Sequence, residues 1–212
     1  MGAIQGRKGD IYLQTGNATA FTGEACHLVS GTTYQISNAA KLNWDRATAV
    51  TVYVGGNPVS SGFTVQYPAG RIVFDADPGD AVTVSGKCYA TTKVGYVQNY
   101  DISIESAALE TTSLGDEART YMGLGLLAWS AAFERLYEND TWAALARANA
   151  TSGYRLLCKF YEDRSGPKRL VWVGYVTVTG HSTNLSLEEL VRENITLQGE
   201  ELIYYIDETE AA

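Results

Sequence analysis

The sequence has little positive charge. Its 16 lysines and arginines stand against 24 aspartates and glutamates, so the formal net charge is −8 at pH 7. A chain with this balance repels a nucleic-acid backbone as a whole, which speaks against a sequence-reading DNA partner. No stretch approaches the roughly 20 apolar residues that a membrane span needs, and no apolar run follows Arg7 and Lys8. We therefore expect no membrane partner and no ordinary export signal.

Cysteine and histidine are also scarce, with three and two residues. Cys26, Cys88 and Cys158 are an odd number at wide spacing, which favours reduced thiols over a disulfide framework. His27 and His181 lie far apart in the sequence, and the adjacent Cys26-His27 pair lacks the spacing of zinc ligands. We predict buried structural thiols, no metal site and no cofactor.

The motifs of common enzymes are incomplete in this sequence. Gly123-Leu124-Gly125 lacks the third glycine and the strand-to-helix setting of a nucleotide-binding loop. Four carboxylates lie in one region, and a pair of carboxylates is what glycoside hydrolysis requires. Carboxylates on a loop are usually only solvated, so we predict no catalysis by Glu105, Glu110, Asp116 and Glu117.

Two clear strand patterns are present near the middle of the chain. In residues 96–105 apolar and polar side chains alternate with a period of two, which predicts a strand with one buried and one wet face. Its apolar residues are Tyr96, Tyr100, Ile102 and Ile104, opposite Asn99, Asp101, Ser103 and Glu105. Residues 127–137 repeat the pattern. Here the apolar residues are Leu127, Trp129, Ala131, Phe133 and Tyr137, and the wet side carries Ser130 and Glu134.

A link of about twenty residues without strong periodicity joins these two strands. A compact domain rarely keeps so long a loop unless the loop has a function. Several apolar residues occur in it, and exposed apolar loops mark contacts with other molecules. The apolar residues are Leu109, Leu114, Tyr121, Met122, Leu124 and Leu126.

The overall pattern predicts an all-β fold, a β-sandwich or barrel with one packed α-helix. Residues 1–15 are expected to form an arm and a short strand. Residues 16–93 read as a β-rich module of hairpins that close on themselves. Residues 94–207 form a second β domain, and the acidic residues 208–212 are expected to fray.

Further boundaries follow from local signals. Asp10–Gln14 reads as a short strand that ends where Gly, Thr and Ser become frequent. Asn139-Asp140-Thr141 supplies capping side chains to a helix near residues 140–151, which Trp142 should hold against the sheet. Val191–Leu197 and Leu202–Ile206 read as two separate strands.

Two stretches of the sequence carry a family resemblance. In ISIESAALETTSLGDEARTYMGLGLLAWSAAFERLY, a TTS-x-G-D segment at Thr111–Asp116 follows a strand, and a G-L…W-S segment leads into the next strand. The second stretch is VWVGYVTVTGHSTNLSLEELVRENITLQGEEL. Together they cover about Val94–Ile206, and this part of the chain resembles the major tail (tail tube) proteins of long-tailed bacteriophages.

The resemblance implies a structural virion protein. Its subunits would form homohexameric rings around an inner β-barrel, and the rings would stack into a tube that encloses a tape-measure protein. The tube would also contact tail terminator or tip proteins and conduct DNA during ejection without binding it specifically. Such a protein belongs to the phage tail and is assembled in the host bacterial cytoplasm. Residues 16–93 would be an addition that the tube-forming part does not need.

Combined with the strand patterns, the resemblance predicts two sets of site residues. The wet faces of the two strands would line the channel, through Asn99, Asp101, Ser103, Glu105, Ser130 and Glu134. The link would contact the next ring in the stack, through Leu109, Thr111, Thr112, Leu114, Asp116, Tyr121, Met122 and Leu124.

Two alternatives stay open at the level of sequence. The hairpin-rich first half, with its aromatic residues, also fits a carbohydrate- or receptor-binding β-sandwich module. The second half also fits the inner tube of a contractile tail.

Overall fold

The computed structural model describes residues 9–106, 109–110, 121–122, 127–152, 155–164, 168–185 and 190–211. This part of the chain consists mainly of antiparallel β-strands, and α1 (Thr141–Ser152) is the single α-helix within it. The predicted all-β fold with one packed helix is therefore confirmed. None of the helices in these ranges is long and apolar enough to cross a membrane.

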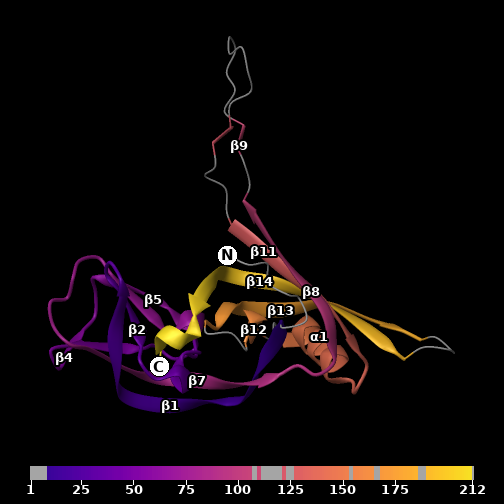
Figure 1. The fold of residues 1–212 in the computed structure, drawn as a ribbon, viewed down its shortest axis with the longest axis horizontal. Helices are drawn as coiled ribbons and strands as arrows, with labels where there is room; N and C mark the ends of the chain where they lie inside the picture. The colour runs from indigo at the N-terminus through magenta and orange to yellow at the C-terminus, as the bar shows by residue number, and fades with distance from the viewer. Residues whose placement is uncertain are drawn as a thin grey trace, which may run out of the picture. The chain divides into compact units, whose positions relative to one another are not determined.

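The chain forms two compact units (Figure 1). Unit 1 comprises residues 1–95, 156–175 and 204–212, and unit 2 comprises residues 96–155 and 176–203. The strands within unit 1 are β1 (Asp10–Ser30), β2 (Thr33–Ile36), β3 (Thr51–Val54), β4 (Asn57–Val59), β5 (Phe63–Gln66), β6 (Arg71–Phe74), β7 (Val82–Lys93) and β12 (Leu156–Asp163). Unit 2 contains α1, β8 (Val97–Ser106), β9 (Leu109–Glu110), β10 (Tyr121–Met122) and β11 (Leu127–Leu136). Both units contain parts of β13 (Leu170–Asn184) and β14 (Arg192–Asp207).

Strand β1 is much longer than predicted, because it continues past Gln14 to Ser30. The register between β1 and β7 shifts between Thr15 and Thr19 and again between Phe21 and Glu24. Glycines with positive φ lie at these shifts, Gly16 at 64° and Gly23 at 63°. Such glycines form bulges that bend a strand without ending it. The Gly-rich composition was therefore a signal of bulges and not of a strand end.

The strands of residues 16–93 pair with one another, but this first part of the chain also contacts strands that come later in the sequence. Strand β1 pairs with β7 along one edge and, through residues 10–13, with β12 along the other. Ala69 belongs to a core cluster that also contains Leu157 and Val173. The Tyr175 hydroxyl donates a hydrogen bond to the backbone oxygen of Trp44. Local patterns identify strands but not their distant partners, so the sequence could not show this dependence on the later strands.

The expectation of a frayed end is wrong for Glu208. This residue begins a 3₁₀ helix (Glu208–Ala211) and is buried. Its Oε1 lies 2.5 Å from Lys159 Nζ, and its Oε2 accepts a hydrogen bond from Tyr161 Oη at 2.7 Å. A buried lysine requires a counter-charge, which explains why an acidic residue so near the end of the sequence is held inside the fold.

Strand β14 replaces the two strands predicted over residues 191–206. The predicted break between Leu197 and Leu202 is a local distortion within one strand, where Glu201 has a φ of 59°. The indole of Trp129 lies directly against Gly199, because a Cβ atom built there would be 2.0 Å from the ring. Trp129 Nε1 also donates to the backbone oxygen of Glu201 at 3.1 Å. The glycine therefore admits a large ring and does not end the strand.

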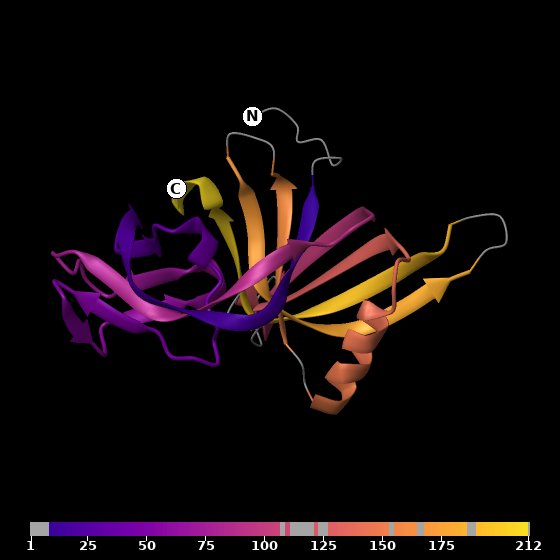
Figure 2. The same ribbon diagram turned by 90° about the horizontal axis from the view of Figure 1, so that it is seen from below.

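In unit 2 the strands follow the order β13-β14-β11-β8, and α1 packs on one face of this sheet (Figure 2). The helix begins as predicted, with the side chain of Asn139 accepting a hydrogen bond from the Thr141 backbone N–H at 3.2 Å. Trp142 is buried and meets Phe133 of β11 edge to face, with ring centroids 4.9 Å apart. Asn149 Nδ2 donates to the Val178 backbone oxygen of β13. These contacts fix the helix on one face, and the described residues of unit 2 leave the other face uncovered.

Candidate functional site

The residues predicted to line a channel lie together on the uncovered face of the unit 2 sheet. In the register of β8 with β11, Ser103 lies opposite Ser130 and Asn99 opposite Glu134. Asp101 and Glu105 lie on the same face, because side chains two residues apart share a face of a strand. All six predicted residues are exposed or half-buried. We call this surface the polar face.

Strand β14 widens the polar face with residues that were not identified from the sequence. Gln198, Thr196 and Asn194 lie opposite Ser130, Ala132 and Glu134. Along β14, exposed residues 192, 194, 196 and 198 alternate with buried residues 193, 195 and 197. This alternation in RENITLQ was a usable signal that the polar face continues onto a third strand.

The charges on the polar face are unevenly distributed. Towards β14 the acidic groups are paired. Arg192 Nη1 lies 2.8 Å from Glu134 Oε1, and Arg155 Nε lies 2.5 Å from Glu200 Oε2. On β8 no lysine, arginine or histidine among the described residues lies within ion-pair distance of Asp101 or Glu105. The face is therefore nearly neutral at β14 and negative at β8.

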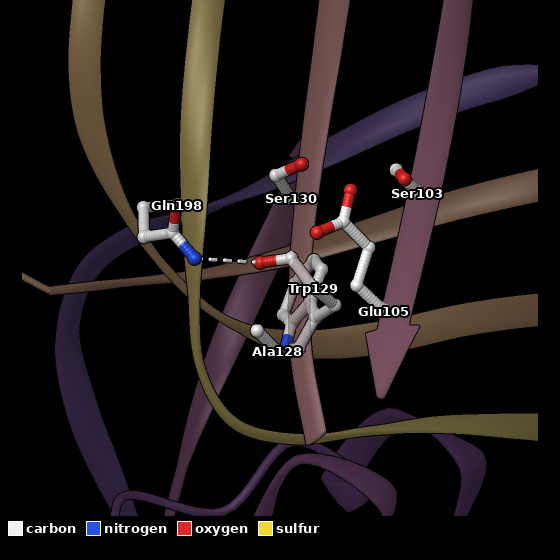
Figure 3. Close-up of a pocket in the computed structure, with 6 residues that line it drawn as sticks. All are labelled: Ser103, Glu105, Ala128, Trp129, Ser130 and Gln198. Carbon is white, nitrogen blue, oxygen red and sulfur yellow. Dashed lines mark hydrogen bonds between the residues drawn. The ribbon is translucent and has the colours of Figure 1, made fainter. Parts of the chain in front are cut away.

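A shallow pocket of about 90 Å³ lies on this face (Figure 3). The residues around it are Ser103, Glu105, Ala128, Trp129, Ser130 and Gln198. Gln198 Nε2 donates to the Trp129 backbone oxygen at 2.9 Å, as Figure 3 shows, so this amide is held in the wall of the pocket. Glu105 is the single carboxylate of the lining, and no group of three potential metal ligands occurs in the described ranges. The lining offers hydrogen bonds and one negative charge, which suits a wetted surface.

The opposite face of the sheet is apolar as predicted, but its burial differs between strands. On β11, Trp129, Ala131 and Phe133 are buried. On β8, Ile102 is half-buried and Ile104 is 43% exposed. The reason is topological, since β8 ends the strand order while α1 contacts β11 and β13. The expectation that β8 buries its whole apolar face is therefore only partly met.

A group of charged residues is also buried on the covered face. Arg135 Nε lies 2.7 Å from Glu193 Oε1, and Glu193 is fully buried. These two atoms are not aligned as a hydrogen bond, so the contact is an ion pair. The other Glu193 oxygen lies 2.8 Å from His181 Nε2, and Arg135 Nη2 lies 3.5 Å from Glu138. The group ties β11, β13 and β14 together and was not identified from the sequence.

The predicted ring-stacking link is only partly described. Its backbone contains a short antiparallel pair, in which Leu109 of β9 lies opposite Met122 of β10 and Glu110 lies opposite Tyr121. The link therefore contains regular structure that its aperiodic sequence did not predict. Thr111, Thr112, Leu114, Asp116 and Leu124 lie outside the described residues.

No family model and no curated protein matches this sequence. Among solved structures, part of the fold is similar to a chain from the virion of a native gene transfer agent particle. That match has a TM-score of 0.45 and 13% identity, and it covers 55% of this chain and 88% of the other. A chain from the tail of an empty gene transfer agent particle, computed with helical refinement and C6 symmetry, gives a TM-score of 0.46 at 13% identity. It covers 55% of this chain and 87% of the other.

Both matches are likenesses over a segment of the chain. The likeness concerns the fold of that segment.

Proposed function

We propose that this chain is the major tail (tail tube) subunit of a long-tailed phage. In this proposal its subunits form homohexameric rings that stack into a tube, enclose the tape-measure protein and conduct DNA during ejection. The polar face of the unit 2 sheet is the observation that carries the proposal. It is a broad, hydrogen-bonding surface on a sheet whose other face packs against α1.

The edge of this sheet supports self-association. Among the described strands, β8 has a neighbour on one side only, which is β11. An open strand edge is a ready template for pairing with another chain, and proteins usually cover or close such edges. Ile104 of β8 and Leu127 of β11 are also more than 40% exposed on the apolar side. Pairing of β8 with a neighbouring subunit would continue the sheet and place its polar face on the inside of a barrel.

The charge of the polar face suits a channel through which DNA passes without binding. A lysine or arginine presented to a phosphate releases counterions and adds attraction, and a ring multiplies this by its number of subunits. Here Arg155 and Arg192 are both held by glutamates, while Asp101 and Glu105 repel phosphates. Repulsion of this kind acts over a Debye length of about 10 Å at 0.1 M salt.

The remaining parts of the proposal rest on the sequence resemblance. The link between β8 and β11 would contact the next ring, and the tube ends would contact tail terminator or tip proteins. The subunit would be assembled in the host cytoplasm and be found in the virion. A sheath around the tube in an image of the native particle would identify a contractile tail instead.

The first test is electron microscopy of the purified protein. Rings or tubes are expected, whereas monomers that bind glycans would favour a carbohydrate-binding module. The second test replaces Asp101 and Glu105 by lysine in the phage. Tails should assemble normally, and genome ejection should be slowed or incomplete because DNA is attracted to the wall.

A matched control changes the same amount of charge elsewhere. Asp75 and Asp77 are exposed residues of unit 1, and their replacement by lysine should leave ejection unchanged. Normal ejection with Asp101→Lys/Glu105→Lys in intact tails would place the polar face outside the channel and contradict the proposal.

A further inference from the structure

A second cluster lies in unit 1, where β12, β13 and β14 each contribute one side chain. Trp172 Nε1 donates a hydrogen bond to Glu162 Oε1 at 3.1 Å, and Tyr205 Oη donates to Glu162 Oε2 at 3.0 Å. The two rings are in tilted contact, with centroids 4.6 Å apart and planes inclined by 40°. Tyr205 is 42% exposed, and Glu162 and Trp172 are half-buried. The cluster is therefore built from defined contacts and is still accessible.

Among the described residues, no cation compensates the charge of Glu162. The two donors to Glu162 are neutral, and no lysine, arginine or histidine of the described ranges lies within 4.0 Å of the carboxylate. The two hydrogen bonds fix the direction of the carboxylate beside the aromatic surface, and each oxygen keeps a lone pair for a further donor. The site is thus pre-organised for a positively charged donor.

Elsewhere in unit 1, aromatic rings and a carboxylate each contact a cation. The guanidinium of Arg164 lies 4.4 Å from the ring centroid of Tyr12 and 5.5 Å from that of Tyr161. Tyr161 in turn donates to the carboxylate of Glu208, which also pairs with Lys159. Within this fold, tyrosine rings therefore contact one cation, Arg164, and a carboxylate pairs with another, Lys159.

We infer that the Glu162–Trp172–Tyr205 cluster is a docking site for an arginine side chain of a partner protein. A guanidinium is planar, can donate to a carboxylate and stacks on aromatic faces, so it gains from both parts of the cluster. The net charge of −8 favours a basic partner in general. A sugar fits less well, because the cluster offers one carboxylate and a half-buried indole. This inference does not depend on the tail tube proposal.

The test measures binding of labelled N-acetyl-arginine amide to the full chain by equilibrium dialysis. N-acetyl-citrulline amide has nearly the same shape without the charge and serves as the matched probe. The arginine probe should bind saturably at one site per chain, and the citrulline probe should not. Displacement of the arginine probe by neutral monosaccharides would identify a sugar site and overturn the inference.

Variants assign the binding to the cluster. Glu162→Gln keeps the size of the side chain and removes its charge, so binding should weaken about tenfold or more. Tyr205→Phe keeps the ring and should weaken binding less. Asp75→Asn removes an exposed charge elsewhere in unit 1 and should leave affinity unchanged. Wild-type affinity in a Glu162→Gln variant with an unchanged melting temperature would overturn the inference, as would the absence of saturable binding to the wild type.

Discussion

The two units of the chain use their sheets in different ways. Unit 1 draws on three separate stretches of the sequence, and its core joins side chains from the first and the last of them, such as Tyr12 and Ile206. Unit 2 buries one face of a simple sheet under α1 and exposes the other as the polar face. An antiparallel sheet can bury one face and leave the other to water, and unit 2 is the part of the chain that uses its sheet in this way.

Both units nevertheless bury an ion pair. In unit 1, Lys159 and Glu208 attach the end of the chain to β12. In unit 2, Arg135 and Glu193 link β11 to β14. Buried pairs of this kind add little net stability, but removing one partner leaves a charge without compensation. Removing one partner of either pair is therefore the change by which the stability of the two units is best compared.

The largest effect is expected from Glu193→Gln in unit 2. The change removes the buried counter-charge of Arg135 and leaves only the half-exposed Glu138 near it, which should lower the free energy of unfolding by about 3–5 kcal/mol. Urea unfolding followed by tryptophan fluorescence measures this loss. The double variant Arg135→Met/Glu193→Met removes both charges and should be clearly more stable than Glu193→Gln. Equal stability of the two variants would mean that the ion pair is not the cause.

A smaller effect is expected from Gly199→Ala. The added methyl group would lie 2.0 Å from the Trp129 ring, which is buried and held by its hydrogen bond to Glu201. Overpacking of this kind costs about 1–3 kcal/mol. Gly180→Ala is the matched control on β13, because its Cβ would lie 3.2 Å from the Thr196 side chain. A melting temperature that falls equally in both variants would contradict the close contact between Trp129 and Gly199.

Alkaline pH should weaken unit 1. Burial raises the pKa of the Cys26 thiol from 9.0 to about 12, and burial also raises the pKa of Cys158, Tyr161 and Tyr175. The folded state therefore holds these protons more tightly than the unfolded state. Their contribution to stability is complete below the unfolded pKa, near 9 for the thiols, and is lost as the pH rises above it.

Each such group should lower the free energy of unfolding by about 1.4 kcal/mol per pH unit in that range. Burial lowers the pKa of Lys159, so this group acts in the opposite direction. Its effect is to make the folded state more stable as the pH rises towards the ordinary pKa of lysine, 10.5. Hydrogen exchange of β12 between pH 8 and 10.5 gives its local free energy of unfolding. The change of this free energy with pH measures the balance between the thiols and tyrosines on one side and Lys159 on the other. Cys26→Ala should reduce the pH dependence of this free energy. An unchanged slope against pH in that variant would show that the Cys26 thiol does not contribute.

The smallest effect is expected from Arg192→Ala on the polar face. Its ion pair with Glu134 is partly exposed, and exposed pairs contribute about 0.2–1 kcal/mol. The melting temperature should change little and should differ less from the wild type at high salt. A loss as large as that of Glu193→Gln would show that the polar face is not a solvated surface in the isolated subunit.

Much of unit 2 was predictable from the sequence because its signals are local. Alternation in residues 97–106 and 127–136 reports which side chains share a face, and it placed Asn99, Asp101 and Ser130 on one surface. Asn139 marks the start of α1 because an amide side chain can satisfy a free N–H group of the first turn. The apolar face of β8 was predicted less well, since its burial depends on where α1 lies.

Only the tertiary structure decided which strands are partners and which charges are paired. The pairing of Asp10 with Tyr161 and the burial of Glu208 join parts of the chain that no local pattern relates. The same holds for Arg135 with Glu193, where opposite charges meet because two distant strands adopt one register. Amino-acid sequence determines local conformation through backbone and side-chain preferences, whereas long-range pairing is selected by the packing of the whole core.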